Sequence, residues 1–168
     1  MPTIQIREAD AGDIPTVRIL FEEYAAGLDV DLAFQDFARE LAELPGAYAP
    51  PAGALLLAWR ADQPLGCVAV RAFSPPAIAE LKRLYVRPAA RGLRLGEQLT
   101  RIAIAHAREA GYRRLRLDTL PDMQRAQRLY RELGFREILP YRHNPIPGTF
   151  YMELDLEKAV PAPQAAGG

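Results

Sequence analysis

The chain has 168 residues, of which 49% are hydrophobic, so it is long enough to bury the core of one domain. Its 21 basic residues are balanced by 21 acidic residues, so no global charge favours nucleic acid or an anionic membrane as a partner. The single cysteine, Cys67, excludes an internal disulfide framework. Because no apolar run approaches about 20 residues and no targeting segment opens the chain, we expect a cytoplasmic protein without a membrane span.

Hydrophobic spacing in the first half of the chain predicts alternating strands and helices. Aspartates stand where the helices are expected to begin, and glycine or proline stands where they are expected to end. The expected elements are a strand at residues 3–7, a helix at 10–27, a second helix between Asp31 and Pro45, and a hairpin of strands 54–59 and 65–73.

Residues 80–96 form the central stretch, which joins a strand to a helix through a short turn. The composition of residues 79–86 predicts a strand that Pro88 ends, and helical spacing begins at Leu95. The turn Arg91-Gly92-Leu93-Arg94-Leu95-Gly96 would therefore aim unpaired backbone N–H groups and the positive end of a helix dipole at one spot. A diphosphate would fit there, and a plain loop that uses its glycines for geometry fits the local pattern about equally well.

The last third of the chain continues the alternation and contains no internal repeat. The helix that begins near Leu95 ends at Gly111, and Asp122 is expected to cap a later helix that ends at Gly134. The expected strands are residues 113–119, 135–140 and 150–156, the last two separated by a loop at 141–148. We expect one domain over residues 1–158 and a disordered tail over 159–168.

Two motifs give the chain a resemblance to the GNAT superfamily of acyl-CoA-dependent N-acyltransferases. Leu84-Tyr85-Val86-Arg87-Pro88 followed by Arg91-Gly92-Leu93-Arg94-Leu95-Gly96 is similar to the acetyl-CoA signature Arg/Gln-x-x-Gly-x-Gly/Ala. Ala126-Gln127-Arg128-Leu129-Tyr130-Arg131-Glu132-Leu133-Gly134-Phe135 is similar to Ala-x-x-Leu-Tyr-x-x-x-Gly-Phe. The resemblance implies an α/β fold, with a single mixed sheet of about seven strands, two helices on each face, and splayed fourth and fifth strands.

Two positions depart from the patterns of the family. Arg94 replaces the middle glycine of the signature, and because arginine at positive φ costs about 1 kcal/mol, we expect ordinary helical angles there. Met123 replaces an asparagine that often stands three residues before the alanine of the second motif. That change weakens a hydrogen bond usually assigned to the asparagine but leaves the fold in place.

The resemblance implies a site for acetyl-CoA along the splayed strand and the turn. Backbone groups of Leu84, Tyr85 and Val86 would pair with the pantetheine, and the N–H near Val86 is a candidate oxyanion donor. The N–H groups of the turn would bind the diphosphate. The residues assigned to the coenzyme are Leu84, Tyr85, Val86, Arg91, Gly92, Leu93, Arg94, Leu95 and Gly96. Two histidines and one cysteine, far apart in sequence, give no metal-ligand spacing, so no metal is expected.

The resemblance also implies two catalytic residues. Tyr130 matches the general acid that protonates the departing sulfur, although helical spacing alone would also fit a core aromatic. Glu80 lies where several family members carry a catalytic glutamate, and the alternative is an exposed glutamate at a strand end. An alkyl ammonium has a pKa of about 10, so a base or a water chain must remove a proton before the amine attacks.

The expected function is the transfer of an acetyl group from acetyl-CoA to the primary amine of a small molecule in a ternary complex. The alternatives are acetylation of a protein lysine or N-terminus, and an acyl-CoA sensor without turnover. Arg142 in the late loop and Arg83 in the central strand are candidate ligands for an acidic acceptor, although strand alternation puts Arg83 opposite Glu80 unless a bulge intervenes. A homodimer through the late strands is also plausible.

Overall fold

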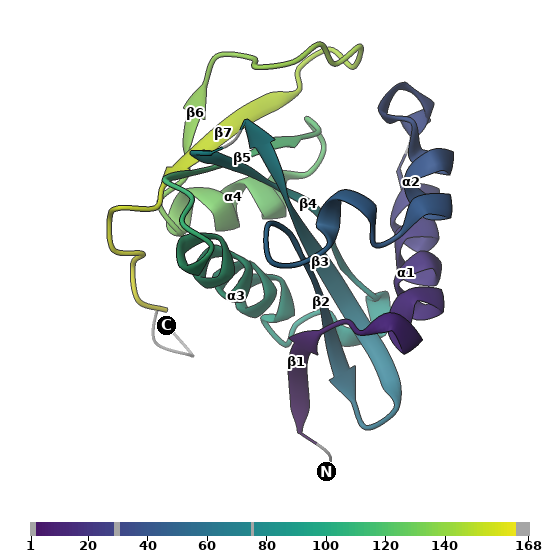
Figure 1. The fold of residues 1–168 in the computed structure, drawn as a ribbon. Helices are drawn as coiled ribbons and strands as arrows, with labels where there is room; N and C mark the ends of the chain where they lie inside the picture. Colours follow the sequence, from purple (N-terminus) through teal and green to yellow (C-terminus); the bar gives the residue numbers. More distant parts are fainter. Residues whose placement is uncertain (1–2, 29–30, 75, 164–168) are drawn as a thin grey trace.

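The structure is a computed structural model that describes residues 3–28, 31–74 and 76–163. Within these residues, seven strands form one sheet in the order β1-β2-β3-β4-β5-β7-β6 (Figure 1). Their bounds are β1 Ile4–Glu8, β2 Ala54–Arg60, β3 Gln63–Ser74, β4 Ile78–Val86, β5 Arg114–Thr119, β6 Arg136–Ile138 and β7 Phe150–Asp155. The β4–β5 pair is parallel, and the other neighbouring strands are antiparallel, which confirms the predicted mixed sheet.

Two helices cover each face of the sheet, as the sequence predicts (Figure 1). Helices α1 (Ile14–Ala26) and α2 (Phe37–Glu43) lie on one face, and α3 (Leu95–Glu109) and α4 (Gln124–Glu132) lie on the other. Strand alternation divides the core accordingly, since Leu55 and Leu57 pack with α1 while Leu56 and Ala58 pack with α3. No helix in the described part of the chain is long and apolar enough to cross a bilayer.

The predicted divergence of the fourth and fifth strands is confirmed. Strand β4 has nine residues, yet it pairs with β5 only from Ile78 to Glu80, opposite Arg114 to Arg116. Beyond Glu80 the edge of β4 that faces β5 has no partner strand among the described residues. This open edge exposes backbone hydrogen-bonding groups in the middle of a sheet, where another strand would ordinarily satisfy them.

A bulge in β4 resolves the question of where Arg83 points. The pairing with β3 shifts by one residue between Cys67 and Ala69, and Arg83 takes a left-handed conformation with φ 61°. Lys82 and Arg83 therefore both face α1 and α2, on the same side of the sheet as Glu80. Simple alternation would have placed Arg83 on the opposite face.

Three local predictions were wrong. The second predicted helix is divided at Asp36, whose φ of 56° separates a 3-10 turn, Leu32–Gln35, from α2. Helix α4 begins at Gln124 after Met123, and no side chain caps it, so Asp122 does not perform the predicted capping role. Arg94 takes a left-handed conformation, with φ 58° and ψ 27°.

The predicted boundary between the domain and its C-terminal tail falls after residue 158, and the structure describes only part of that tail. Val160 packs against the main core, whereas residues 164–168 lie outside the described residues. The division between a domain at residues 1–158 and a tail at 159–168 stays a prediction. Strand β6 forms one edge of the sheet, and the predicted homodimer through the late strands also stays a prediction.

Candidate active site

A cleft of about 680 Å³ opens where β4 and β5 diverge. Its walls are the end of β4, the turn before α3, the beginning of α4 and the end of α1. The cleft brings together eight of the nine residues predicted to bind the coenzyme, namely Leu84, Tyr85, Val86, Arg91, Gly92, Arg94, Leu95 and Gly96. Leu93 is not among the lining residues, and its side chain is 40% exposed.

The left-handed conformation of Arg94 corrects the expectation of helical angles. Arg91 is still extended, with φ −69° and ψ 150°, and four residues later the chain is in α3. Gly92 and Arg94 both take positive φ within this short reversal, and Arg94 stands directly before α3, at the position of the middle glycine of the signature. The left-handed conformation of Arg94 costs about 1–2 kcal/mol. Its carbonyl oxygen accepts a hydrogen bond from the N–H of Gln98 at 3.1 Å.

Gly96 leaves the beginning of α3 open toward the cleft. A β-carbon built at this position would meet only Leu129, at 3.8 Å, so the protein interior does not require glycine there. Because the first N–H groups of a helix have no partners within it, the turn offers donors and a positive dipole end to an anion. Three cleft residues, Arg91, Arg94 and Arg125, add cationic side chains. The cleft thus has the donors that a diphosphate requires.

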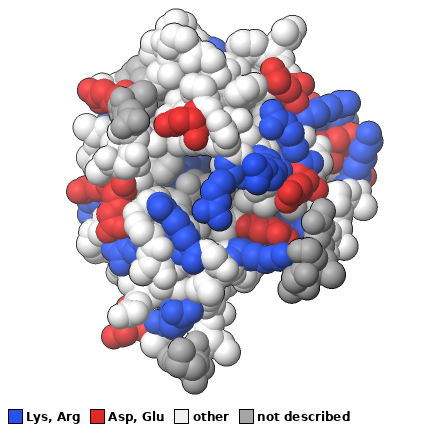
Figure 2. Space-filling model, turned by 180° about the vertical axis from the view of Figure 1, so that it is seen from behind, with Lys and Arg blue, Asp and Glu red and all other residues white. Residues whose placement is uncertain are grey.

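Lys and Arg side chains gather around a hollow on the side of the molecule opposite to the view of Figure 1 (Figure 2). Acidic side chains also lie on this face, some at its rim and some directly beside the basic ones (Figure 2). The chain as a whole has a formal net charge of zero, so this gathering is a local feature that overall composition cannot reveal.

The backbone direction at Val86 follows from the hydrogen bond made by the next residue. Arg87 donates its N–H to the carbonyl of Leu65 at 2.8 Å, on the β3 side. Successive N–H groups in a strand point to opposite sides, so the N–H of Val86 points away from β3, toward the open edge. It is a fixed donor at the position where the sequence predicts an oxyanion donor.

Tyr130 lies in α4 with its side chain 5% exposed. Its ring packs against Phe135, with 5.5 Å between centroids, so it partly fills the core role that was the alternative to catalysis. Burial raises the pKa of the Tyr130 phenol, and Tyr24 and Asp118 act in the same direction. The hydroxyl therefore keeps its proton through the neutral range.

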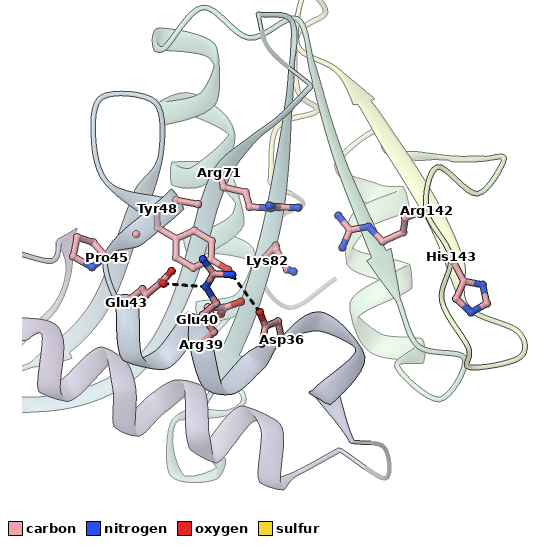
Figure 3. A pocket seen from close by; sticks show the side chains of 12 residues that line it. Asp36, Arg39, Glu40, Glu43, Pro45, Tyr48, Arg71, Lys82, Arg142 and His143 are labelled. Atoms are coloured by element: carbon pink, nitrogen blue, oxygen red, sulfur yellow. Dashed lines mark hydrogen bonds and ion pairs between the residues drawn. The ribbon is translucent and has the colours of Figure 1, made fainter.

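A second cavity, of about 320 Å³, lies on the α2 side of the sheet (Figure 3). One wall comes from α2 and the segment after it, and includes Glu40, Glu43 and Tyr48. The opposite wall comes from β3, β4 and the late loop, which contribute Arg71, Lys82 and Arg142. Figure 3 shows Arg71 and Lys82 reaching from the strands toward the space that Arg142 enters from the loop.

Glu80 is fully buried beneath this cavity and was expected, in the alternative to catalysis, to be exposed. Its carboxylate accepts hydrogen bonds from Arg71 Nε at 2.9 Å, from the Tyr141 hydroxyl at 2.8 Å, and from Arg142. Burial acts to raise the pKa of Glu80, but Lys82 and Arg142 outweigh it and lower the pKa. A carboxylate so well satisfied is a weak proton acceptor, so its predicted role as base stays a prediction that these contacts disfavour.

Arg83 is not among the residues that line either cavity. Its guanidinium donates to both carboxylate oxygens of Glu40, at 2.8 and 2.9 Å, and lies over the rings of Tyr24 and Phe37. Its side chain is 2% exposed. Because its donors already face a carboxylate, this placement does not support the predicted contact of Arg83 with the acceptor.

Sequence reasoning missed three residues that line the second cavity or contact Glu80 next to it, namely Arg71, Lys82 and Tyr141. A charged residue inside an otherwise apolar strand was the available signal for Arg71, which follows Val68, Ala69 and Val70. Tyr141 gave no such signal, because its contact with Glu80 spans 61 residues of sequence.

Comparisons with known proteins agree with this geometry. The sequence model of the Acetyltransferase (GNAT) family matches residues 17–135. An uncharacterized N-acetyltransferase of Schizosaccharomyces pombe is 43% identical over 147 residues, which cover 87% of this chain and 90% of that protein. The uncharacterized N-acetyltransferase YjgM of Escherichia coli is 30% identical over 137 residues, covering 79% and 82% of the two chains.

The fold is also that of solved acetyltransferases. The Salmonella typhimurium protein yncA, solved with its cofactor acetyl-CoA, matches with a TM-score of 0.68 at 21% identity, covering 97% of this chain and 99% of that chain. A family match over most of the sequence, the splayed parallel strands and the cleft between them lead to one conclusion. The chain belongs to the GNAT family of acetyltransferases and is an acyl-CoA-dependent N-acetyltransferase.

Proposed function

We propose that this enzyme transfers the acetyl group of acetyl-CoA to the primary amine of a small molecule by direct attack in a ternary complex. The observation that carries the proposal is the position of β4 between two cavities. Its open edge lines the cleft through Leu84 and Val86, and Lys82, a few residues earlier, lines the second cavity. Two substrates can therefore approach the same strand from different sides.

The cleft binds acetyl-CoA in this proposal. The donors of the turn and of the first residues of α3 receive the diphosphate, and Arg91, Arg94 and Arg125 neutralise phosphate charge. Backbone groups of Leu84, Tyr85 and Val86 hold the pantetheine amides as a neighbouring strand would. Coenzyme binding thus satisfies the backbone groups that the divergence of β4 and β5 leaves open.

The reaction in this proposal uses one fixed hydrogen-bond donor, the N–H of Val86, and one proton donor, the hydroxyl of Tyr130. The N–H of Val86 stabilises negative charge on the thioester oxygen as the amine nitrogen forms its bond to the carbonyl carbon. When the carbon–sulfur bond breaks, the Tyr130 hydroxyl protonates the leaving sulfur and regains a proton from solvent. The substrate ammonium first gives one proton to a water chain, and the nitrogen loses a second proton to water as the amide forms, so the products are an amide, a free thiol and one released proton.

The size of the second cavity supports a small acceptor over a protein. A volume of about 320 Å³ is at the lower end of the range for small-molecule sites. Its lining comes from α2 on one side and includes Arg142 and His143 of the late loop on the other, and a space of this size between them favours a small ligand over a folded protein surface.

Release of the coenzyme thiol tests the proposal. The purified enzyme would be mixed with acetyl-CoA and a panel of small primary amines, with a lysine-containing peptide as the competing acceptor. We expect at least one small amine to raise thiol release well above the background hydrolysis rate, and to exceed the peptide in kcat/KM. Binding of acetyl-CoA without acceptor-dependent release would instead indicate a sensor, and preference for the peptide would indicate a protein acetyltransferase.

A further inference from the structure

We propose that Arg71 and Arg142, held in place by Glu80, form an anion-binding site in the second cavity, so that the acceptor is a small amine carrying a carboxylate or phosphate. The inference rests on the proposed function and names its acceptor class. It also gives Glu80 a positioning role, and it replaces Arg83 with Arg71 as the partner of Arg142.

The first argument is the balance of charge around the cavity. Among the described residues, Glu80 is the only ion-pair partner of two guanidinium groups, Arg71 and Arg142, whose side chains are 29% and 18% exposed, and Asp118 acts on Arg142 only from beyond ion-pair distance. One carboxylate cannot neutralise both, and partly buried cations without full compensation favour a bound anion. On the opposite wall Glu40 is paired with Arg83, while Asp36 and Glu43 both lie beside Arg39 and are 70% and 57% exposed, so water screens these two carboxylates more than the charges around Glu80.

The state of Lys82 is a second sign of local positive potential. Lys82 lines the same cavity, and burial together with the charge of Arg83 lowers the pKa of its ammonium to about 8. Glu80 and Glu40 act in the opposite direction but do not restore the ordinary value. A bound anion would relieve the repulsion among these cations.

The geometry of the two guanidinium groups is the second argument for an anion site. Within the described residues, Arg71 uses only Nε and Arg142 only one terminal nitrogen in side-chain hydrogen bonds, so each guanidinium keeps donors for a ligand. Arg142 lies over the rings of Phe73 and Tyr141, at 5.3 and 5.2 Å from their centroids, and Arg71 lies 5.8 Å from that of Phe73. The planar groups are held before a ligand arrives, which lowers the entropy cost of binding.

The position of Glu80 explains how the two arginines, from different parts of the chain, reach one place. Its carboxylate bonds Arg71 of β3 on one oxygen, and Tyr141 and Arg142 of the late loop on the other. The same contacts would exist if their purpose were only to fix the loop on the sheet. The two roles differ in what they predict for acceptor selectivity.

Matched acceptors separate these roles. Initial rates would be measured for 4-aminobutanoate against 4-aminobutanamide, and for 2-aminoethyl phosphate against 2-aminoethanol, so that each pair differs mainly in the anion. We expect the anionic member of at least one pair to have the higher kcat/KM, and the pair that responds identifies carboxylate or phosphate. Equal kcat/KM within both pairs would overturn the inference while leaving the proposed function intact.

Variants then assign the effect to residues. Arg71→Ala and Arg142→Ala should each raise KM for the preferred anionic amine about 10- to 100-fold and leave its neutral partner within about twofold. Arg142→Lys should recover only part of the loss, because lysine cannot offer a planar pair of donors. Arg113→Ala, a 73% exposed arginine paired with Glu157, is the matched surface control and should change neither acceptor. Loss of activity toward both members of a pair would support the purely structural role instead.

Glu80→Gln separates positioning from base catalysis. A positioning residue should raise KM for the anionic amine with kcat for the neutral amine and its pH profile unchanged. A lowered kcat for both amines with a shifted pH profile would show Glu80 to be the base and would overturn its positioning role. Melting temperatures of all variants would show that they remain folded.

A calorimetric titration makes the inference independent of turnover. The enzyme with coenzyme A would be titrated with 4-aminobutanoate or 2-aminoethyl phosphate, and with each neutral partner. Binding of an anionic probe that Arg142→Ala weakens would support the site even if no amine were acetylated, in which case only the proposed function would fail. Equal binding of anionic and neutral probes would overturn the site.

Discussion

The Tyr130 hydroxyl can be removed without removing the packing of the ring against Phe135. Tyr130→Phe should therefore leave the fold and acetyl-CoA binding intact while lowering kcat by roughly 10²- to 10⁴-fold, the range for one general acid. Steady-state kinetics would measure the loss, and the rise in melting temperature with acetyl-CoA would report binding. Normal turnover in the variant would remove Tyr130 from the mechanism and leave it as a core aromatic.

At the residue scale, the sequence identified most of the cleft but less of the second cavity. Motif residues such as Gly96 and Tyr130 are close in sequence to the elements they complete, so a local pattern can locate them. The contacts of Glu80 with Arg142 and of Arg83 with Glu40 join residues 62 and 43 positions apart. Only the folded chain brings such partners together, and no spacing rule on one sequence contains them.

Two glycines, Gly66 in the strand next to β4 and Gly96 at the beginning of α3, lead to opposite predictions for stability. A β-carbon at Gly66 in β3 would lie 2.5 Å from the carbonyl oxygen of Tyr85, so Gly66→Ala must push β4 away. We expect a loss of about 1–3 kcal/mol in the free energy of unfolding, together with weaker acetyl-CoA binding, because Tyr85 and Val86 line the cleft. Denaturant unfolding and a coenzyme titration would measure both effects.

Gly96→Ala is the variant to compare with Gly66→Ala. The position has room for a methyl group, and alanine favours a helix over glycine by about 1 kcal/mol, so unfolding should require more free energy. The same methyl would enter the cleft and should weaken acetyl-CoA binding. Unchanged affinity in Gly96→Ala would argue against the turn as the diphosphate site, and unchanged stability in Gly66→Ala would show that the two strands can separate easily.

At the element scale, hydrophobic periodicity predicted the order and type of the strands and helices, because each buries a regular face. It did not predict the breaks in that regularity. Arg83, at the bulge, and Arg94 take a positive φ that arginine rarely adopts, and Asp36 takes one that aspartate adopts more often, although no pattern in the sequence marks this position. At Asp36 the break separates a 3-10 turn from α2, whose Glu40 pairs with Arg83, so the sequence pattern gave one continuous helix where the packing required two pieces.

For the molecule as a whole, the buried ion pair between Glu40 and Arg83 ties α2 to the centre of the sheet. The side chains are 15% and 2% exposed, and removing one partner leaves a buried charge. Glu40→Gln should therefore lower the free energy of unfolding at neutral pH by on the order of 3 kcal/mol. Denaturant unfolding of both proteins would measure the difference, with the exposed Glu22→Gln as the control for removing a carboxylate.

The same pair predicts how that difference depends on pH. Burial acts to raise the pKa of Glu40, but Arg83 outweighs it, and the folded pKa lies below the ordinary value of 4.5. A group whose pKa is lowered on folding stabilises the protein above its unfolded pKa, and this contribution disappears as pH falls through the folded pKa. The stability difference between wild type and Glu40→Gln should thus be constant from pH 7 to about pH 5 and shrink below about pH 4.5. If unfolding measured across this range gave a difference that did not change, the ionised carboxylate of Glu40 would not be what holds α2 against the sheet.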